Sequence, residues 1–221
     1  MKEAPLFIHI PWIPEYLLYT WVIMAMLFAV SFAVSRSIKP LPAGIQNFFE
    51  IAVDGILKFM EDIIGHHSRQ YLPLIGTLAF FILISNLIGL VPGFMSPTSN
   101  INTTAACAII VFFATHYYGV KAHGIGYLKH FIGPAWWLAP LMIPLEIIGH
   151  LARVLSLSLR LFGNIFGEDL ILLILVFLVP ILAPLPMMFI AVFTSVVQTF
   201  VFVLLTMIYI KLATEEAEEG H

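Results

Sequence analysis

Charged residues and cysteine are scarce in this chain. Only 10% of its 221 residues are Asp, Glu, Lys or Arg, and Cys107 is the single cysteine. One cysteine can form neither a disulfide within the chain nor a thiolate cluster for a metal, so Cys107 is predicted to be a packing residue. The net charge of -3 says little about function, because four of the thirteen acids lie in the last eight residues, and no nucleic-acid partner is expected. Nothing in the composition indicates a bound cofactor or metal.

Hydrophobic residues, in contrast, make up 61% of the chain, and the mean hydropathy is +1.00. Both values lie well outside the range of soluble globular proteins and indicate that the chain resides in a lipid bilayer. The length leaves room for about five or six spans of roughly 20 residues and for no sizeable soluble domain. We therefore predict a single all-α integral membrane domain over residues 1–221.

Four helical segments are predicted in the first half of the chain. Residues 16–34 form a first span, which is retained because no basic region precedes it as it would in a signal peptide. Residues 42–64 carry acids at helical spacing opposite an apolar face, which is typical of an amphipathic helix on the membrane surface. Residues 72–92 and 101–120 form a membrane hairpin joined by a cluster of turn formers.

Basic residues in the connections predict the orientation in the membrane. Arg36 and Lys39 follow the first span, and Lys121 and Lys129 follow the returning arm of the hairpin. Lys and Arg are enriched in cytoplasmic loops, so these connections are cytoplasmic and the N-terminus lies outside.

The last third of the chain is apolar over unusually long stretches. Residues 132–179 would form a helix about 70 Å long, more than twice the hydrocarbon thickness of a bilayer. This segment is either a hairpin of two spans or one long, steeply tilted helix over 135–178, and no polar turn cluster marks a hairpin. A second long tilted helix is predicted over 181–212, and 213–221 is a cytoplasmic tail that bears four acids.

Polar residues in the first long segment fall on one helical face. At about 100° per residue, six of them lie within about 40° of one line, with Ser156 at its edge and Asp169 off it. One isolated pair of these residues could be explained as a buried salt bridge that holds the helices together. The polar line, however, continues for more than six turns and is faced by Gln198 on the next helix, which favours its interpretation as the wall of an ion or proton pathway. The six residues are Glu146, His150, Arg153, Arg160, Asn164 and Glu168.

Arg160 has a distinct role on this face. A guanidinium stays protonated and cannot relay protons, so it acts as a fixed positive charge. Such a charge attracts a carboxylate and blocks cations moving along the same line. Acids on both sides of it therefore suggest two access paths separated by an electrostatic gate.

Four stretches carry a resemblance to a known family: "PLEIIGHLARVLS", "SLSLRLFGN" followed by "IFGEDLILLIL", "QTFVFVLLTMIYI", and "NLIGLVPGF" with the "PT" and "NTT" after it. They resemble subunit a of the F-type ATP synthase, the membrane stator beside the rotating c-ring. The resemblance covers about residues 70–212 and implies five membrane helices, the last two long and steeply tilted, plus one amphipathic surface helix. It implies the c-ring, the peripheral stalk subunit b and other ATP synthase subunits as partners, and no bond chemistry in this chain.

The resemblance also assigns roles to single residues. Arg160 matches the family's essential arginine, which attracts each passing c-subunit carboxylate and prevents a proton short circuit. Asn164 and Gln198 match polar residues that line the path beside it. Glu146 and Ser156 match positions on the cytoplasmic side.

The acid of the outer half-channel is left open between two neighbours. When the chain is matched to the family without a gap from Asn164 onward, the acid is Asp169. The helical periodicity instead selects Glu168, because Glu168 lies on the polar face and Asp169 does not. In some relatives a histidine pairs with this acid, but here that position is Ala191 and the nearest polar groups are Thr194 and Ser195. The outer half-channel must therefore use another relay, such as a hydroxyl with water.

The histidines permit several interpretations. His150 is either a cytoplasmic proton relay or a buried neutral side chain with one hydrogen bond. The other histidines in the second half are expected to be ordinary loop or interface residues, and the adjacent pair after the amphipathic helix lies at the wrong spacing to share a metal on one helical face. These residues are His116, His123 and His130, and the pair His66 and His67.

The sequence thus predicts a proton-translocating stator subunit in a multi-pass membrane protein of a bacterial inner membrane, although residues 180–212 also resemble the chloroplast branch. The alternative is an autonomous ion channel or carrier whose polar stripe lines its own pore. The choice between protons and sodium and the size of the ring depend on the ring, which is not in this chain.

Overall fold

The computed structural model describes residues 14–36, 44–65, 68–91, 93–124, 139–178 and 184–215, together with positions 12 and 182. Every regular element in this part of the chain is helical, which confirms the predicted all-α fold. In chain order the elements are α1 (Glu15–Arg36), α2 (Ile45–Ile64), η1 (Ser68–Tyr71), α3 (Leu72–Ile88), η2 (Pro97–Ser99), α4 (Ile101–His123), α6 (Ala139–Leu178) and α7 (Pro184–Glu215).

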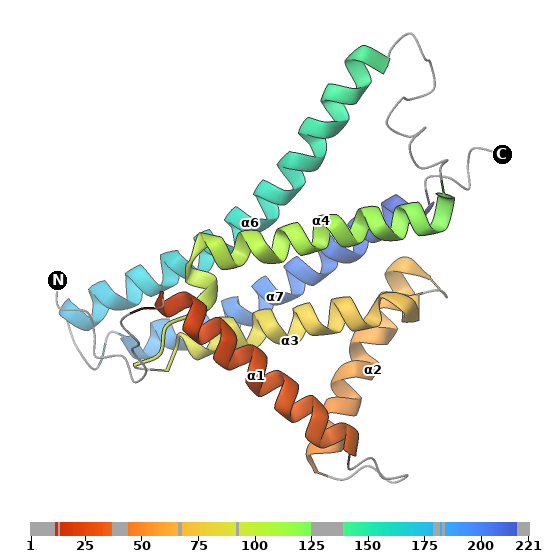
Figure 1. Ribbon diagram of the computed structural model, residues 1–221. Helices are drawn as coiled ribbons and strands as arrows, with labels where there is room; N and C mark the ends of the chain where they lie inside the picture. The colour runs from red at the N-terminus through yellow and green to blue at the C-terminus, as the bar shows by residue number, and fades with distance from the viewer. Residues whose placement is uncertain are drawn as a thin grey trace.

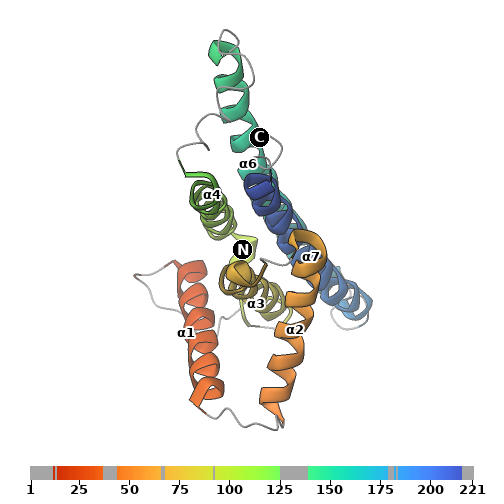
Figure 2. The ribbon, with the colours of Figure 1, turned by 90° about the vertical axis from the view of Figure 1, so that its right-hand side faces the viewer.

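Five of these helices, α1, α3, α4, α6 and α7, are long and apolar enough to cross a bilayer. The sixth, α2, is amphipathic: Met60 is fully buried against α3 and α7, while Asp54 and Glu61 are exposed on the other face. Five membrane helices and one amphipathic helix are therefore confirmed. Figure 2 shows α1 and α2 together on one side of the molecule and α6 with α7 on the other.

Helix α6 is one continuous helix of 40 residues that runs through Pro144 and past Gly163 and Gly167. At 1.5 Å per residue it is about 60 Å long, roughly twice the thickness of the hydrocarbon core. The hairpin alternative is thus excluded for residues 139–178, and a helix of this length fits a bilayer only when it is steeply tilted. In Figure 1, α6 crosses α4 obliquely and its first turns project beyond the other helices. The 32-residue α7 is also over-long for a perpendicular span.

The main core determines how α6 is rotated about its own axis. Leu157, Leu161 and Ile165 of α6 are buried in a cluster with residues of α1, α3, α4 and α7. Cys107 belongs to the same cluster and is only 4% exposed, so its prediction as a packing residue is confirmed. Arg160 lies about 100° around the helix from Leu161, outside this buried face, and is exposed.

A tight contact joins the end of α3 to the segment that precedes α4. A Cβ added at Gly89 would lie 2.7 Å from the Cβ of Ser96, and Ser96 donates a hydrogen bond to the Ser85 carbonyl at 2.8 Å. Gly89→Ala is therefore expected to push this segment away from α3 and to destabilise the protein by about 1–3 kcal/mol, the usual result of overpacking.

Thermal unfolding of the purified protein in detergent measures this effect. Gly76→Ala is the matched control, because Gly76 lies within the same helix and an added Cβ there meets no atom within 4 Å. We expect the control to keep or slightly raise the midpoint, since Ala is a better helix former than Gly. Equal midpoints for both variants would contradict the close contact.

Candidate proton-pathway site

Arg160 lies on the exposed face of α6. Large apolar side chains, including Leu155 and Leu159, are also exposed on this part of α6, and α7 exposes Phe193 and Val197. Within the described chain, no hydrogen bond or ion pair engages its guanidinium. A lone charge at membrane depth costs roughly 2.5–3.5 kcal/mol on insertion scales, so this arginine is placed to meet water or a negative group that does not belong to this chain.

One turn further along α6, Asn164 contacts α7. Its side-chain amide donates a hydrogen bond to the carbonyl oxygen of Gln198. Gln198 is 4% exposed, and its own amide nitrogen has no hydrogen-bond partner among the described residues. A buried donor of this kind is costly unless it binds a polar group, and it is suited to water or a carboxylate oxygen. The two amides that the sequence selected are therefore brought together beside Arg160.

The two neighbouring acids turn towards different elements. Glu168 is buried, only 9% exposed, and its carboxyl makes a hydrogen bond with Thr194 on α7. Asp169 is half-buried and its carboxyl makes a hydrogen bond with Ser99 on η2. Successive residues of a helix point about 100° apart, which accounts for the divergence. Glu168 thus lies with Asn164 on the α7 side, whereas Asp169 faces the segment before α4.

A chain of polar groups on α3 and η2 continues from Asp169. The Ser99 hydroxyl donates to the Ser96 carbonyl at 2.8 Å, and the Ser96 and Thr98 hydroxyls lie 2.8 Å apart. Thr98 donates to the side-chain carbonyl of Asn86 at 2.7 Å, and the Asn86 amide is 3.4 Å from the Thr199 hydroxyl on α7. All five of these side chains are buried. They form a polar connection from Asp169 across α3 to α7, which we call the hydroxyl–amide chain.

Sequence reasoning did not select these five residues. The segment around Ser96 consists of turn formers, which indicate a connection between two spans, and the family resemblance of residues 86–104 assigns no role to single residues there. The available signal was Asn86, an amide within an apolar span, because a polar group at such a position needs a partner.

Ala191 is fully buried on α7, next to the site of the acids. Thr194 and Ser195 are the polar residues within the next turn of α7, and the buried Ser195 hydroxyl has no hydrogen-bond partner in the described chain. Neither side chain is ionisable near neutral pH. This region of α7 therefore offers hydroxyl groups and no imidazole to the two acids.

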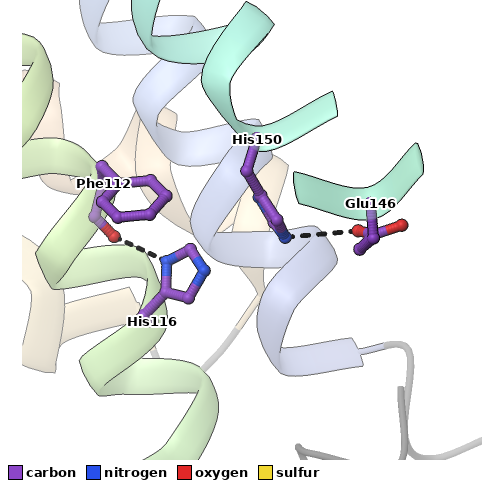
Figure 3. A network of polar contacts seen from close by, with 4 residues as sticks. All are labelled: Phe112, His116, Glu146 and His150. Carbon is purple, nitrogen blue, oxygen red and sulfur yellow. Dashed lines mark hydrogen bonds and ion pairs between the residues drawn. The ribbon is translucent and has the colours of Figure 1, made fainter. Parts of the chain in front are cut away.

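A second polar group lies towards the other end of α6, near the first turns of that helix. Nε2 of His150 is 3.2 Å from Oε1 of Glu146, and its ring centroid is 4.7 Å from that of His116 on α4. His116 is held by a 2.8 Å hydrogen bond between Nδ1 and the Phe112 carbonyl. Figure 3 shows the two imidazoles between the α4 and α6 ribbons, with Glu146 beyond His150. His116, expected to be an ordinary interface residue, thus belongs to this group.

The remaining residues of the predicted stripe are not all in contact with one another. Arg153 turns to α7, where its guanidinium lies 5.7 Å from the centre of the Tyr209 ring. Ser156 is exposed one turn before Arg160. His123 contacts the Thr214 carbonyl at 2.8 Å. His66, His67 and His130 lie outside the described residues, and among the described ones no three His, Cys, Asp or Glu residues are grouped as metal ligands.

Comparisons with known proteins agree on one family. Residues 17–211 match the family model described as ATP synthase A chain. "ATP synthase subunit a" of Trichlorobacter lovleyi is 56% identical over 90% of this chain and 86% of its own length. "ATP synthase subunit a 1" of Pelobacter propionicus is 57% identical over 90% and 87%, and "ATP synthase subunit a" of Geobacter sulfurreducens is 56% identical over the same shares. The chain therefore belongs to the ATP synthase A chain family.

Proposed function

We propose that this chain is the stator subunit a of an ATP synthase and that it provides two offset proton half-channels to a ring of carboxylate-bearing c-subunits. The exposed position of Arg160 on an apolar face is the observation that carries the proposal. A charge that has no partner among the described residues, on a surface that exposes many apolar side chains, is best satisfied by a counter-charge on another protein. Ionised carboxylates that pass Arg160 one at a time meet this requirement.

The outer half-channel leads from the hydroxyl–amide chain past Asp169 and Glu168 to Gln198 and Asn164. Hydroxyl and amide groups can order water and pass protons to a carboxylate, which replaces the histidine that some relatives have at the position of Ala191. A proton delivered along this path neutralises a ring carboxylate, which can then move through lipid at little electrostatic cost.

The inner half-channel lies on the other side of Arg160. As a neutral carboxylic acid returns towards the arginine, the fixed positive charge favours the ionised form and the proton leaves. Exposed Ser156 and the pair of Glu146 and His150 line the route towards the first turns of α6. Because Arg160 repels protons, neither half-channel alone leads across the membrane.

The proposed orientation follows the distribution of basic residues: the N-terminus lies outside and the C-terminus in the cytoplasm of a bacterial inner membrane. The peripheral stalk subunit b and the remaining ATP synthase subunits complete the assembly. In this function the chain only takes up and releases protons and carries out no other covalent chemistry.

Site-directed crosslinking tests the partner. A photoreactive group attached to Ser156→Cys is expected to capture a small subunit with a membrane-embedded carboxylate, because Ser156 lies one turn from Arg160 on the same exposed face. Phe113→Cys on α4 is the control, since its side chain is 66% exposed but lies on another helix. The native Cys107 is buried and does not compete for the label.

The product is identified by mass spectrometry of the crosslinked complex in its native membrane. Capture of the small subunit from position 156 and not from position 113 supports the proposal. Lipid adducts alone at both positions would favour the autonomous channel or carrier, whose polar residues would have to face its own pore.

A further inference from the structure

The two imidazoles of His116 and His150 come from different helices and lie next to each other. His116 lies seven residues before the end of α4, and His150 lies eleven residues after the start of α6. Their ring centroids are 4.7 Å apart and the ring planes are inclined by 61°. Glu146 contacts the outer side of this pair at His150 (Figure 3). A carboxylate and two imidazoles thus form a row from α6 to α4.

A small cavity of about 20 Å³ adjoins this row and is lined in part by His116, His150, Thr115, Arg153 and Tyr209. This volume is enough for about one water molecule, and the lining offers more than the two polar partners that a buried water needs. The titratable groups that contact the imidazoles or line the cavity are Glu146 and Arg153 on α6 and Tyr209 on α7. The row and the cavity together supply the donors and acceptors that a proton relay requires.

The backbone contact of His116 fixes how its ring can exchange protons. Because Nδ1 is engaged by the Phe112 carbonyl at 2.8 Å, this nitrogen keeps its hydrogen and proton exchange is assigned to Nε2. Imidazole is the side chain that takes up and releases protons most readily near neutral pH. A merely structural histidine at a helix interface would not need an ionisable neighbour on the facing helix.

We infer that His116 and His150 form a two-histidine relay that carries protons from Glu146 across the α6–α4 contact to the cytoplasm. This inference rests on the proposed function and names the exit of its inner half-channel. Glu146 releases a proton to His150, the proton passes directly or through the cavity water to His116, and His116 releases it to cytoplasmic water. Only O–H and N–H bonds form and break, and each group returns to its starting protonation state.

The relay is tested by passive proton conduction in vesicles that carry the assembled membrane sector with its catalytic head removed. His116→Gln is the main variant, because a glutamine amide can still donate to the Phe112 carbonyl but cannot shuttle a proton. We expect it to lower the flux by about a hundredfold or more, the usual contribution of a positioned proton-transfer group. His123→Gln is the matched control, since His123 is on the same helix but contacts the Thr214 carbonyl of α7.

A second variant separates proton transfer from packing. His116→Ala is expected to lose flux to a similar extent and to recover it when millimolar imidazole is added, because the truncated side chain leaves space beside the cavity. The relay would be overturned if His116→Gln kept its full proton flux or lost no more flux than His123→Gln. It would also be overturned if imidazole did not restore flux in His116→Ala. Each of these results leaves Arg160 intact, so none would count against the proposed stator function.

Discussion

Arg160→Ala is expected to abolish acid-driven ATP synthesis in vesicles that contain the assembled complex. Without the fixed charge, an ionised ring carboxylate has no partner as it passes this chain, and nothing drives the incoming acid to release its proton. The loss should approach the detection limit, because coupling depends on every carboxylate being ionised at this one position. Synthesis is measured after an acid-to-base jump, with native gels to show that the complex still assembles.

Vesicles that carry the Arg160→Ala variant should also be permeable to protons. With the catalytic head stripped off, protons are expected to cross the vesicle membrane passively, because the barrier between the two half-channels has been removed. Arg36→Ala serves as the matched control: it removes an arginine at the end of α1, where the guanidinium lies 4.5 Å from the centre of the Phe32 ring, and it should retain coupled synthesis.

A third variant tests what property of the arginine is needed. Arg160→Lys keeps the positive charge but loses the planar, bidentate donor that matches a carboxylate. We expect this variant to block the passive proton leak but to support only a low rate of ATP synthesis. If Arg160→Ala retains coupled synthesis, the polar residues of α6 stabilise the helix bundle and the proposed mechanism fails.

The second large effect is expected at the neighbouring acids. Asp169→Asn should lower ATP-driven proton pumping by about a hundredfold or more, in the range that a general acid or base contributes. Asp169 is the acid in contact with Ser99, at the start of the hydroxyl–amide chain, so its loss removes the proton acceptor where the outer path reaches α6.

Glu168→Gln is the matched comparison, because it changes the adjacent residue in the same way. Its carboxyl makes a hydrogen bond with Thr194 on α7, whereas Ser99 bonds Asp169, so we expect a smaller decrease in pumping. Proton pumping is followed by the quenching of a pH-sensitive dye in the same vesicles. A larger loss in Glu168→Gln than in Asp169→Asn would transfer the role of outer acid to Glu168, as helical phase alone predicts.

Helical periodicity could predict contacts along α6 but not those between helices. The spacing of four residues predicted that Glu146 and His150 share a face, and the structure places them 3.2 Å apart. The same arithmetic placed Glu168 on the line of Asn164 and Asp169 away from it, and the two carboxyls do turn to different neighbours. Such relations within one helix follow directly from 3.6 residues per turn, so they can be predicted from the sequence alone.

The hydroxyl–amide chain and His116 required the structure. Asn86 meets α7 across 113 residues of sequence, and His116 meets His150 across 34 residues of sequence. No periodicity links such positions, because their contact depends on how the helices pack. Turn-forming residues such as Ser96 and Thr98 also served two purposes at once, ending a helix and supplying hydroxyls, and composition indicates only the first.

The unbroken course of α6 has a consequence for the geometry of transport. Glu146 and Asp169 belong to a single continuous helix with no loop between them, and the 22 residues between them set both their separation and their relative rotation. A deletion of one residue between them would shorten the separation by only about 1.5 Å but would turn one acid by about 100° around the rod relative to the other. In the proposed mechanism, the length of this helix therefore sets the angle through which a ring carboxylate travels between binding and releasing its proton.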